Sequence, residues 1–259
     1  MNDRMTAVKS ALRTLQILEI FAEQRRPLAL GELARLMASP KSSCLALLAT
    51  LAERGYLYRV GLDGAWYPTR RWLDNASQVA EHDMVAAEVK LSLRRLRDAT
   101  GETAIHAVLV GERSVYLDVV ESVELVRFTA RAGDSKPLHA SASGRAQLAV
   151  LEPAERDAVM RKLTLERITS RTRVTHKALA QTVQEEGARG WSANYGEFRP
   201  DVISIAAGLR LGAAVHSLVV AAPYQRVEKK VEKIGQAVRA EAQALARRLQ
   251  GQGSKETRR

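Results

Sequence analysis

The sequence predicts an α+β protein in two folded parts joined by a long helix. Two features of the pattern support this fold class. Residues 8–68 contain three apolar-striped segments and then two short β-rich runs around a glycine turn, and residues 103–222 contain strands, then helices, then strands again. The first order favours a small helical domain with a hairpin, and the second favours a mostly antiparallel sheet with helices packed on it.

The N-terminal part has the pattern of a winged helix-turn-helix. Apolar residues recur every three or four positions over residues 8–22, as on one face of an amphipathic helix: Val8, Leu12, Leu15, Leu18 and Phe21. A second short helix begins at Leu30, and a third covers residues 40–54, "PKSSCLALLATLAER", with Ser39 as its expected N-cap and Gly55 as its expected C-cap. The runs "YLYRV" and "AWYP" on either side of "GLDG" predict a hairpin.

The polar break at residues 38–40 bears on the function of the three-helix segment. A short break sets the flanking helices at a steep angle, so the helix after it can present its N-terminal face to the major groove of DNA. The pattern alone leaves a second interpretation open, in which the helices form a small hairpin that serves only for packing.

Residues 69–100 predict a long helix whose apolar stripe could join two domains and pair with a copy of itself. After it, β-rich runs, helical segments and further β-rich runs follow one another: 103–110, 113–120 and 125–131; then 143–151, 153–163 and 175–188; then 191–198, 202–209 and 215–222, with a last helix over 224–249. The expected divisions are 1–71 for the winged helix-turn-helix, 72–98 for the linker helix, 99–250 for the α+β domain and 251–259 for a disordered basic tail.

The composition narrows the possible partners. The 259 residues carry a formal net charge of +11, with a pI of about 10.1, and this balance suits an anionic partner such as nucleic acid or an anionic membrane surface. The sequence shows neither a signal peptide nor an apolar run long enough to span a membrane, so we expect a cytoplasmic protein. A single cysteine, Cys44, excludes an intramolecular disulfide and disfavours a cysteine-based metal site.

Several stretches together resemble the IclR family of bacterial transcriptional regulators, over roughly residues 8–225. They are "SPKSS", "LLATLAERGYLYR", "GETAIHAVLVGERSVYLDVVES", "KPLHASASGRAQLAVL" and "RGWSANYGEFRPDVISIAA". The resemblance implies a winged helix-turn-helix followed by a GAF-like domain that binds a small effector. It also implies a dimer or a tetramer that represses or activates genes of small-molecule metabolism, with double-stranded operator DNA as partner and no cofactor.

At the DNA-binding end, the residue types that contact phosphates and base edges give a set of candidates. They are Lys41, Ser42, Ser43, Ala46, Thr50, Arg59, Arg70 and Arg71. Members of the family often carry a histidine and an arginine where this chain has Leu45 and Ala46. The third helix therefore lacks the arginine–guanine contact, and base reading would rest on Lys41 and the serines, or on the shape of the DNA.

At the effector end, "LHASASGRAQLAVL" resembles the mouth of the family's ligand pocket. Its small residues let a ligand approach the backbone, and the start of a helix favours a carboxylate, so we expect an organic or aromatic acid. The pattern alone leaves a second interpretation open, a serine-capped helix with nothing bound. The candidate effector-binding residues are Phe128, Ala130, Ser141, Ala142, Ser143, Asn194, Ser204 and Val219. Asn194 stands where relatives usually have an acidic residue, and this suits a more anionic or a differently oriented effector.

Two other functions were weighed. An enzyme using Ser141 or Ser143 with His139 is disfavoured, because the sequence has no GxSxG elbow, no placed acidic partner and no glycine-rich nucleotide loop. The five histidines also show no metal-ligand spacing, so no metal is expected. A ligand-binding sensor or scaffold with weak or lost DNA binding stays open because of Leu45 and Ala46.

Overall fold

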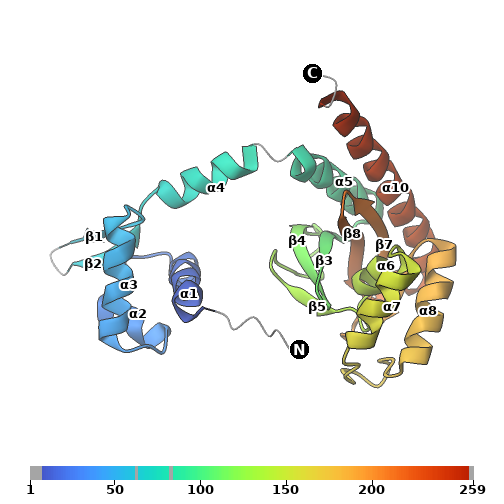
Figure 1. The fold of residues 1–259 in the computed structure, drawn as a ribbon, viewed down its shortest axis with the longest axis horizontal. Helices are drawn as coiled ribbons and strands as arrows, with labels where there is room; N and C mark the ends of the chain where they lie inside the picture. Colours follow the sequence, from blue (N-terminus) through green and yellow to red (C-terminus); the bar gives the residue numbers. More distant parts are fainter. Residues whose placement is uncertain (1–7, 62–63, 82–83, 257–259) are drawn as a thin grey trace. The chain divides into compact units, whose positions relative to one another are not determined.

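The computed structural model describes residues 8–61, 64–81 and 84–256, and the chain divides into two compact units. Unit 1 covers residues 1–83 and unit 2 covers residues 84–259 (Figure 1). Each unit encloses its own buried apolar cluster, which is the mark of separately folded parts.

Unit 1 is a winged helix-turn-helix, as the sequence predicts. Its elements are α1 (Lys9–Gln24), α2 (Leu30–Leu36), α3 (Lys41–Glu53), β1 (Leu57–Val60), β2 (Ala65–Pro68) and α4 (Arg71–Glu81). β1 and β2 form an antiparallel hairpin, and Leu28 adds one antiparallel bridge to Trp66. The apolar faces of the three helices and the hairpin share one core, which includes Ile17, Phe21, Leu33, Cys44, Leu48 and Trp66.

The turn from α2 to α3 is a Schellman motif without glycine. Ser39 N donates to Ala34 O at 2.9 Å, Ala38 N donates to Arg35 O at 3.1 Å, and Ala38 has a left-handed φ of 46°. The extended residue before α3 is Pro40, not Ser39, and no side chain caps the helix. The predicted Ser39 cap is therefore wrong by one position, and the Ser39 hydroxyl has no hydrogen-bond partner among the described residues. The predicted C-terminal glycine, Gly55, is confirmed by its φ of 76°.

α1 buries a different face from the one the spacing predicts. Ile17, Ile20 and Phe21 are buried, whereas the side chains of Val8, Leu12 and Leu15 are 65%, 54% and 57% exposed. α1 carries two apolar stripes, and the core of unit 1 takes the one that contains both isoleucines. The other stripe stays on the surface of the chain.

The predicted linker, residues 72–98, corresponds to α4 and to α5 (Met84–Thr100). Residues 82 and 83, between them, lie outside the described residues. The apolar stripe predicted for this segment is used inside unit 2, because Val89, Leu93 and Leu96 of α5 pack into its core.

Unit 2 is a six-stranded antiparallel sheet with helices on both faces, which confirms the α+β prediction. The strands, in the spatial order β5-β4-β3-β8-β7-β6, are β5 (Ser135–Pro137), β4 (Arg113–Val120), β3 (Thr103–Val110), β8 (Ala214–Pro223), β7 (Val202–Leu211) and β6 (Ser192–Tyr195). The remaining helices are α6 (Ala142–Ala149), α7 (Pro153–Lys162), α8 (His176–Arg189), the short α9 (Tyr224–Val227), a 3-10 turn over Glu228–Lys230 and α10 (Val231–Glu256).

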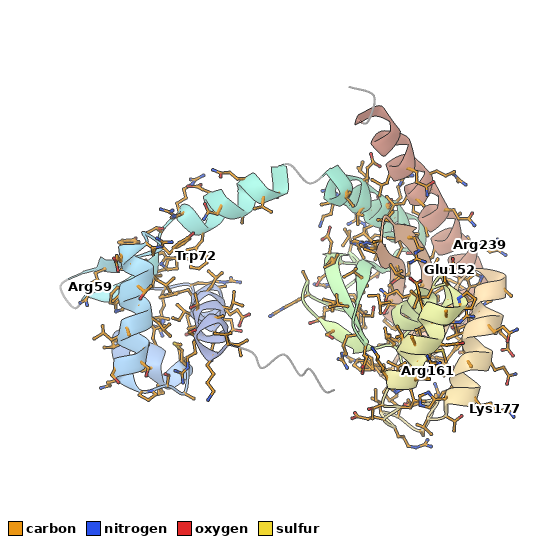
Figure 2. All side chains as sticks on the ribbon, viewed as in Figure 1. Arg59, Trp72, Glu152, Arg161, Lys177 and Arg239 are labelled. Atoms are coloured by element: carbon orange, nitrogen blue, oxygen red, sulfur yellow. The ribbon has the colours of Figure 1, made fainter. Side chains whose placement is uncertain are left out.

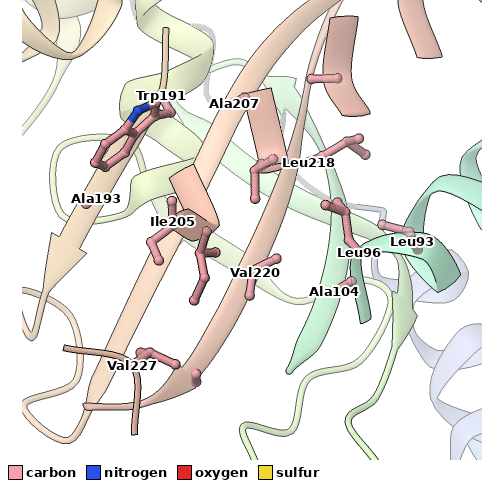
Figure 3. Close-up of a cluster of buried hydrophobic side chains, with 14 of the residues drawn as sticks. Leu93, Leu96, Ala104, Trp191, Ala193, Ile205, Ala207, Leu218, Val220 and Val227 are labelled. Carbon is pink, nitrogen blue, oxygen red and sulfur yellow. The ribbon is translucent and has the colours of Figure 1, made fainter. Parts of the chain in front are cut away.

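Helices lie against both faces of the sheet (Figure 1), and each face has a separate core. On one face, α5 and α10 cover Ala104, Ile205, Leu218 and Val220, with Trp191 at one side of the cluster (Figure 3). On the other face, α6 covers a smaller cluster that includes Ile105, Ala206 and Val219. α6 also packs with α7 and α8 in a further apolar cluster. Neighbouring residues of a strand thus serve opposite faces, as the pleat requires.

Two predictions for unit 2 differ from the structure. Residues 125–131, predicted as a strand, form none, because β5 takes the place beside β4. Two carbonyl groups of this loop are instead bound by side chains: Phe128 O accepts from Thr103 Oγ1 at 2.6 Å, and Val126 O accepts from Arg226 Nη1 at 2.8 Å. α10 extends to Glu256, into the segment predicted as a disordered tail, because a helix-favouring run leads into it.

Candidate DNA-binding surface and effector cavity

α3 has one buried face and one exposed face. Cys44, Leu48 and Leu51 are buried, whereas the opposite positions are exposed: Lys41, Ser42, Leu45, Ala46, Ala49 and Thr50. Ser43 is half-buried. Because no side chain caps α3, its first N–H groups have no side-chain partner and can donate to a phosphate. The exposed surface combines one cation with small or apolar side chains.

Three arginines of the candidate set lie next to α3 in sequence, on the hairpin and at the start of α4. The guanidinium of Arg59 lies 4.5 Å from the centre of the Trp66 ring, and that of Arg71 lies 5.1 Å from the centre of the Tyr56 ring. Arg70 is paired with Asp74 at 3.2 Å, one helical turn further along α4. All three are exposed, so their positive charges can reach DNA phosphates.

The start of α6 is buried and fully capped. Ser141 Oγ accepts from Gly144 N at 3.1 Å and donates to Pro137 O at 2.7 Å. A Cβ atom on Gly144 would lie 2.4 Å from Leu138 Cα, so only glycine lets α6 come this close to the preceding segment. Ser143 Oγ lies 3.4 Å from Ser141 Oγ. The hydroxyl of Ser141 is thus used to hold the helix in place.

Asn194 on β6 links two backbone segments beside α6. Its side-chain Nδ2 donates to Ala140 O, and its Oδ1 accepts from Glu197 N at 2.8 Å. The side chain is 4% exposed. An aspartate could not make the first of these bonds, because an ionised carboxylate has no hydrogen to donate. The amide at this position therefore has a structural role in addition to facing the cavity.

An inner cavity of about 30 Å³ lies between β4, β7 and the start of α6. Its lining residues are Tyr116, Phe128, Lys136, Ser141, Asn194, Phe198, Arg199, Val202, Ser204 and Ala221. Lys136 Nζ lies 5.4 Å from the centre of the Tyr116 ring and 5.0 Å from that of Phe198. Burial, with a smaller contribution from Asp134, raises the pKa of Tyr116, so its phenol stays protonated at neutral pH. The cavity is positively charged and bordered by aromatic rings.

An outer hollow of about 480 Å³ adjoins the inner cavity and shares three of its residues, Phe128, Arg199 and Val202. Arg127, Arg171 and Arg199 line it, together with the carboxylate of Asp201. Arg127 is paired with Glu121 at 2.9 Å and Arg199 with Asp201 at 3.1 Å.

A buried arginine fixes α6 relative to its neighbours. Arg145 has no exposed surface and pairs with Glu186 at 2.9 Å and with Glu197 at 3.1 Å. Its Nη2 also donates to Ala193 O at 2.6 Å. Burial alone would lower the pKa of Arg145, but the two carboxylates outweigh that effect and raise it above its ordinary value. Arg145 thereby joins α6, α8, β6 and the loop after β6.

The structure brings together half of the predicted effector residues. Phe128, Ser141, Asn194 and Ser204 line the inner cavity, whereas Ala130, Ala142 and Val219 lie in the apolar cluster behind it and Ser143 is buried in α6. Sequence reasoning missed Tyr116, Lys136, Phe198, Arg199 and Val202. Two signals were present in the sequence: Lys136 begins the stretch "KPLHASASGR", and Phe198 and Arg199 lie in "GEFRP".

The arrangement does not form a serine nucleophile with a base. His139 Nε2 is hydrogen-bonded to Glu166 O at 3.0 Å, and Ser141 Oγ donates to a carbonyl. His106 Nε2 lies 2.9 Å from His216 Nδ1, so these two imidazoles satisfy one another. No group of three or more potential metal-ligating side chains occurs in the part of the chain that the structure describes. Within the same residues, no helix has both the length and the apolar character needed to cross a membrane.

Both units match known protein families. Residues 77–247 match the family described as bacterial transcriptional regulator IclR, C-terminal, and residues 10–61 match the IclR helix-turn-helix domain. The chain is 31% identical to the transcriptional repressor IclR of Escherichia coli over 187 residues, which are 71% of this chain and 68% of that protein. It is 29% identical to the regulator BhcR of Paracoccus denitrificans over 222 residues, which are 85% of this chain and 79% of that protein.

Solved structures share the fold. The IclR protein of Thermotoga maritima superposes with a TM-score of 0.77 at 20% identity, covering 93% of this chain and 98% of that one. An IclR homologue from Microbacterium hydrocarbonoxydans, solved with 4-hydroxybenzoate, superposes with a TM-score of 0.73 at 24% identity, covering 94% of this chain and all of that one. The matched family, which consists of transcriptional regulators and not of enzymes, covers most of both units. This chain therefore belongs to the IclR family: it is a DNA-binding transcriptional regulator with a C-terminal effector-binding domain.

Proposed function

We propose that this chain binds a specific operator through α3 and that a small carboxylate-bearing effector in unit 2 controls this binding. The exposed start of α3 carries the proposal. Lys41 and Ser42 stand on the solvent side of a helix whose other side is buried, and no side chain occupies the first N–H groups. A recognition helix needs this arrangement, with its N-terminal residues free to contact base edges.

The residues of unit 1 divide into two roles in this proposal. Lys41, Arg59, Arg70 and Arg71 contact phosphates and set the orientation on DNA. Ser42, Ser43 and Thr50 hydrogen-bond to base edges, and Ala46 contacts a thymine methyl group, a contact typical of small apolar side chains. Because no arginine stands on the exposed face of α3, discrimination among sequences relies on several weak contacts and on DNA shape.

The working form in the proposal is a homo-oligomer, a dimer or a tetramer. One helix-turn-helix reads a short half-site, and a symmetric pair reads two half-sites. The exposed stripe of α1, with Val8, Leu12 and Leu15, is an apolar surface that a second copy can cover. Leu12→Glu should then lower the oligomeric state measured by light scattering, whereas Leu117→Glu, on an exposed position of β4, serves as the matched control.

The effector in the proposal is an organic or aromatic acid. Lys136 at the inner cavity supports this, because its ammonium group can pair with a carboxylate. Arg199 also lines the cavity but already pairs with Asp201 at 3.1 Å. The solved homologue that holds 4-hydroxybenzoate shares this fold. Regulation requires the effector to bind two arrangements of the protein unequally. In line with the name of its E. coli relative, we take the output to be repression, exerted on the chromosome in the cytoplasm.

Fluorescence anisotropy tests the DNA-binding part. Genomic fragments that the full-length protein selects are compared with scrambled duplexes over a range of salt concentrations. We expect specific binding to be about 10³-fold tighter than binding to scrambled DNA, with an affinity that falls steeply as salt rises. Lys41→Met should weaken binding to both kinds of duplex and reduce the salt slope by about one.

Lys177→Met, an exposed lysine of unit 2, is the control for lost charge and should leave both quantities unchanged. Equal and weak binding to every fragment, with no effect of Lys41→Met, would contradict the proposal. It would favour the alternative function, a ligand-binding sensor or scaffold that has lost DNA affinity. The observation that motivates this alternative is that Leu45 and Ala46 stand where members of the family often carry a histidine and an arginine.

A further inference from the structure

We propose that the effector of this chain is a dianion, with one acidic group held at Lys136 in the inner cavity and the other at Arg171 in the outer hollow. This inference rests on the proposed function, because it names the chemical class of the effector that unit 2 binds. Four observations lead to it.

The first observation is the size of the two spaces. The inner cavity has a volume of about 30 Å³, enough for about two water molecules at 10–15 Å³ each. The outer hollow has a volume of about 480 Å³. An organic acid of several carbons therefore places only its end group in the inner cavity, and the body of the molecule lies in the outer hollow.

The second observation is the boundary between the two spaces. Phe128 and Val202 line both of them, so an apolar wall runs from the inner cavity into the outer hollow. A hydrocarbon or aromatic spacer would lie against this wall with its two ends in different spaces. The geometry fits an elongated molecule with an apolar middle.

The third observation concerns the inner cation. The side chain of Lys136 is only 16% exposed, and its nearest carboxylate oxygen, on Asp134, lies 3.8 Å away. Rings of Tyr116 and Phe198 flank the ammonium group. The charge of Lys136 is thus largely removed from water and weakly neutralised, which strengthens its attraction for an incoming anion.

The fourth observation concerns the outer cations. Arg127 and Arg199 already have carboxylate partners at 2.9 and 3.1 Å. Arg171 has none among the described residues: its Nη1 donates to Tyr195 O at 3.2 Å, and its guanidinium lies 5.0 Å from the centre of the Tyr224 ring. The inner cavity therefore contains one cation whose carboxylate lies at 3.8 Å, and the outer hollow contains one cation that no described carboxylate pairs with. One anionic group in each space would give both cations a close partner.

Isothermal titration calorimetry on the full-length protein tests the inference with matched acids. The pairs are hexanoate with adipate and benzoate with terephthalate, which differ by one carboxylate. We expect the dicarboxylate of at least one pair to bind about tenfold or more tightly than its monocarboxylate, as one additional charge-assisted contact predicts.

Two variants test which cation binds each carboxylate of the ligand. Lys136→Met and Arg171→Gln should each remove most of the preference for the dicarboxylate, because each leaves one carboxylate without its cation. The matched controls, Lys177→Met and Arg161→Gln, lie on the surface of unit 2 and should keep the preference (Figure 2). Circular dichroism of each variant, unchanged from that of the parent chain, shows that the loss does not arise from unfolding.

Three outcomes would overturn the inference: equal binding within both pairs, a preference that survives both variants, or no binding by any of these acids. The outcome also separates this inference from the proposed function. Equal binding within both pairs, together with an altered operator affinity, would leave the regulator in place and reject only the dianion. A strong dicarboxylate preference with unchanged operator affinity would support the dianion and reject effector control of DNA binding.

Discussion

Two helices of this chain begin in serine-rich stretches, "SPKSS" at α3 and "SASGR" at α6, yet one faces solvent and the other is enclosed. α3 begins after Pro40 without a capping side chain, and Lys41 and Ser42 are exposed. α6 begins with Ser141 as a cap, and its residues from Ala142 to Leu148 are buried. The helix that is free to meet a partner leaves its first N–H groups open, and the buried helix has a capped N-terminus.

The difference follows from the cost of burying polar groups. The first N–H groups of a helix lack partners inside it, and burial without a partner costs free energy. Water or a phosphate can serve these groups at α3, so no serine cap is needed there. At α6 the residues are buried, and Ser141 Oγ accepts from the N–H of Gly144. Asn194 and Arg145 donate to the carbonyl groups of Ala140 and His139 just before the helix. Four substitutions test this contrast.

The largest difference in stability is expected between substitutions of the charged residues of the two helices, Arg145 in α6 and Lys41 in α3. Arg145→Met should lower the free energy of unfolding by about 3–5 kcal/mol, because Glu186 and Glu197 lose the fully buried partner that they share. Among the described residues, only the more exposed Arg189 and Arg173 would remain paired with them. Lys41→Met, at the exposed start of α3, should change it by no more than about 0.5 kcal/mol. Urea unfolding followed by circular dichroism measures both. Similar losses of stability from the two substitutions would contradict the expected difference between the buried and the exposed helix.

The next effect concerns glycine. Gly144→Ala should cost about 1–3 kcal/mol, because the added Cβ would lie 2.4 Å from the backbone of Leu138. Gly31→Ala in the exposed part of α2 is the matched control, since the nearest atom, Lys41 Cε, lies 3.7 Å from the added Cβ. The control should be neutral or stabilising by up to about 1 kcal/mol. The melting temperatures of the two variants should therefore move in different directions.

The third substitution restores the acid that relatives usually carry. Asn194→Asp should cost about 1–3 kcal/mol, because the hydrogen bond to Ala140 O is replaced by an oxygen facing an oxygen. The same change should weaken the binding of carboxylates, since it adds a negative charge to the inner cavity. Asn75→Asp on exposed α4 provides the control for the added charge. If calorimetry showed unchanged stability for Asn194→Asp, the hydrogen bond from the Asn194 amide to Ala140 O would contribute little to the free energy of unfolding.

The smallest effect is expected at the turn before α3. Ala38→Gly should stabilise unit 1 by up to about 1 kcal/mol, because Ala38 has a left-handed φ of 46° that glycine adopts without steric cost. Ala49→Gly, on the exposed face of α3, should instead destabilise by about 1 kcal/mol. Thermal unfolding of the two variants distinguishes the signs. Destabilisation by Ala38→Gly would show that the Schellman turn is not strained.

The sequence pattern predicted the bounds of those elements whose hydrogen bonds join residues close together in the chain. β3 and β4 have the bounds that the sequence predicts, 103–110 and 113–120, because a two-residue glycine turn sets the register of a hairpin. The predicted N-cap of α3 was wrong by one residue. The left-handed turn before the helix has Ala38 where glycine is usual, so no residue in the sequence marked the turn. Residues 125–131 have β-favouring composition but pair with no strand, and β5 pairs with β4 instead. Composition does not show which segment takes the place beside a strand.

The effector cavity was predicted from one side only. Ser141, Asn194 and Ser204 come from stretches that resemble the family, and the structure places them at the inner cavity. Lys136, Tyr116 and Phe198 complete it from β5, β4 and the loop after β6, which lie far apart in the sequence. These three side chains come together only because of the order of the strands in the sheet and the side to which each residue points. Neither can be deduced from the pattern of residues along the chain. Arg145 was missed because its charge is compensated by Glu186 and Glu197 from distant segments.

Successive side chains along β8 belong to apolar clusters on opposite faces of the sheet. Val219 and Ala221 belong to the cluster under α6 beside the cavity, while Leu218 and Val220 belong to the cluster under α5 and α10. One backbone carries both sets, and close-packed interiors do not absorb small displacements smoothly. The wall of the cavity and the packing surface of α5 are therefore built on one strand. A substitution in β8 that changes the volume of one cluster should for this reason be felt in the other.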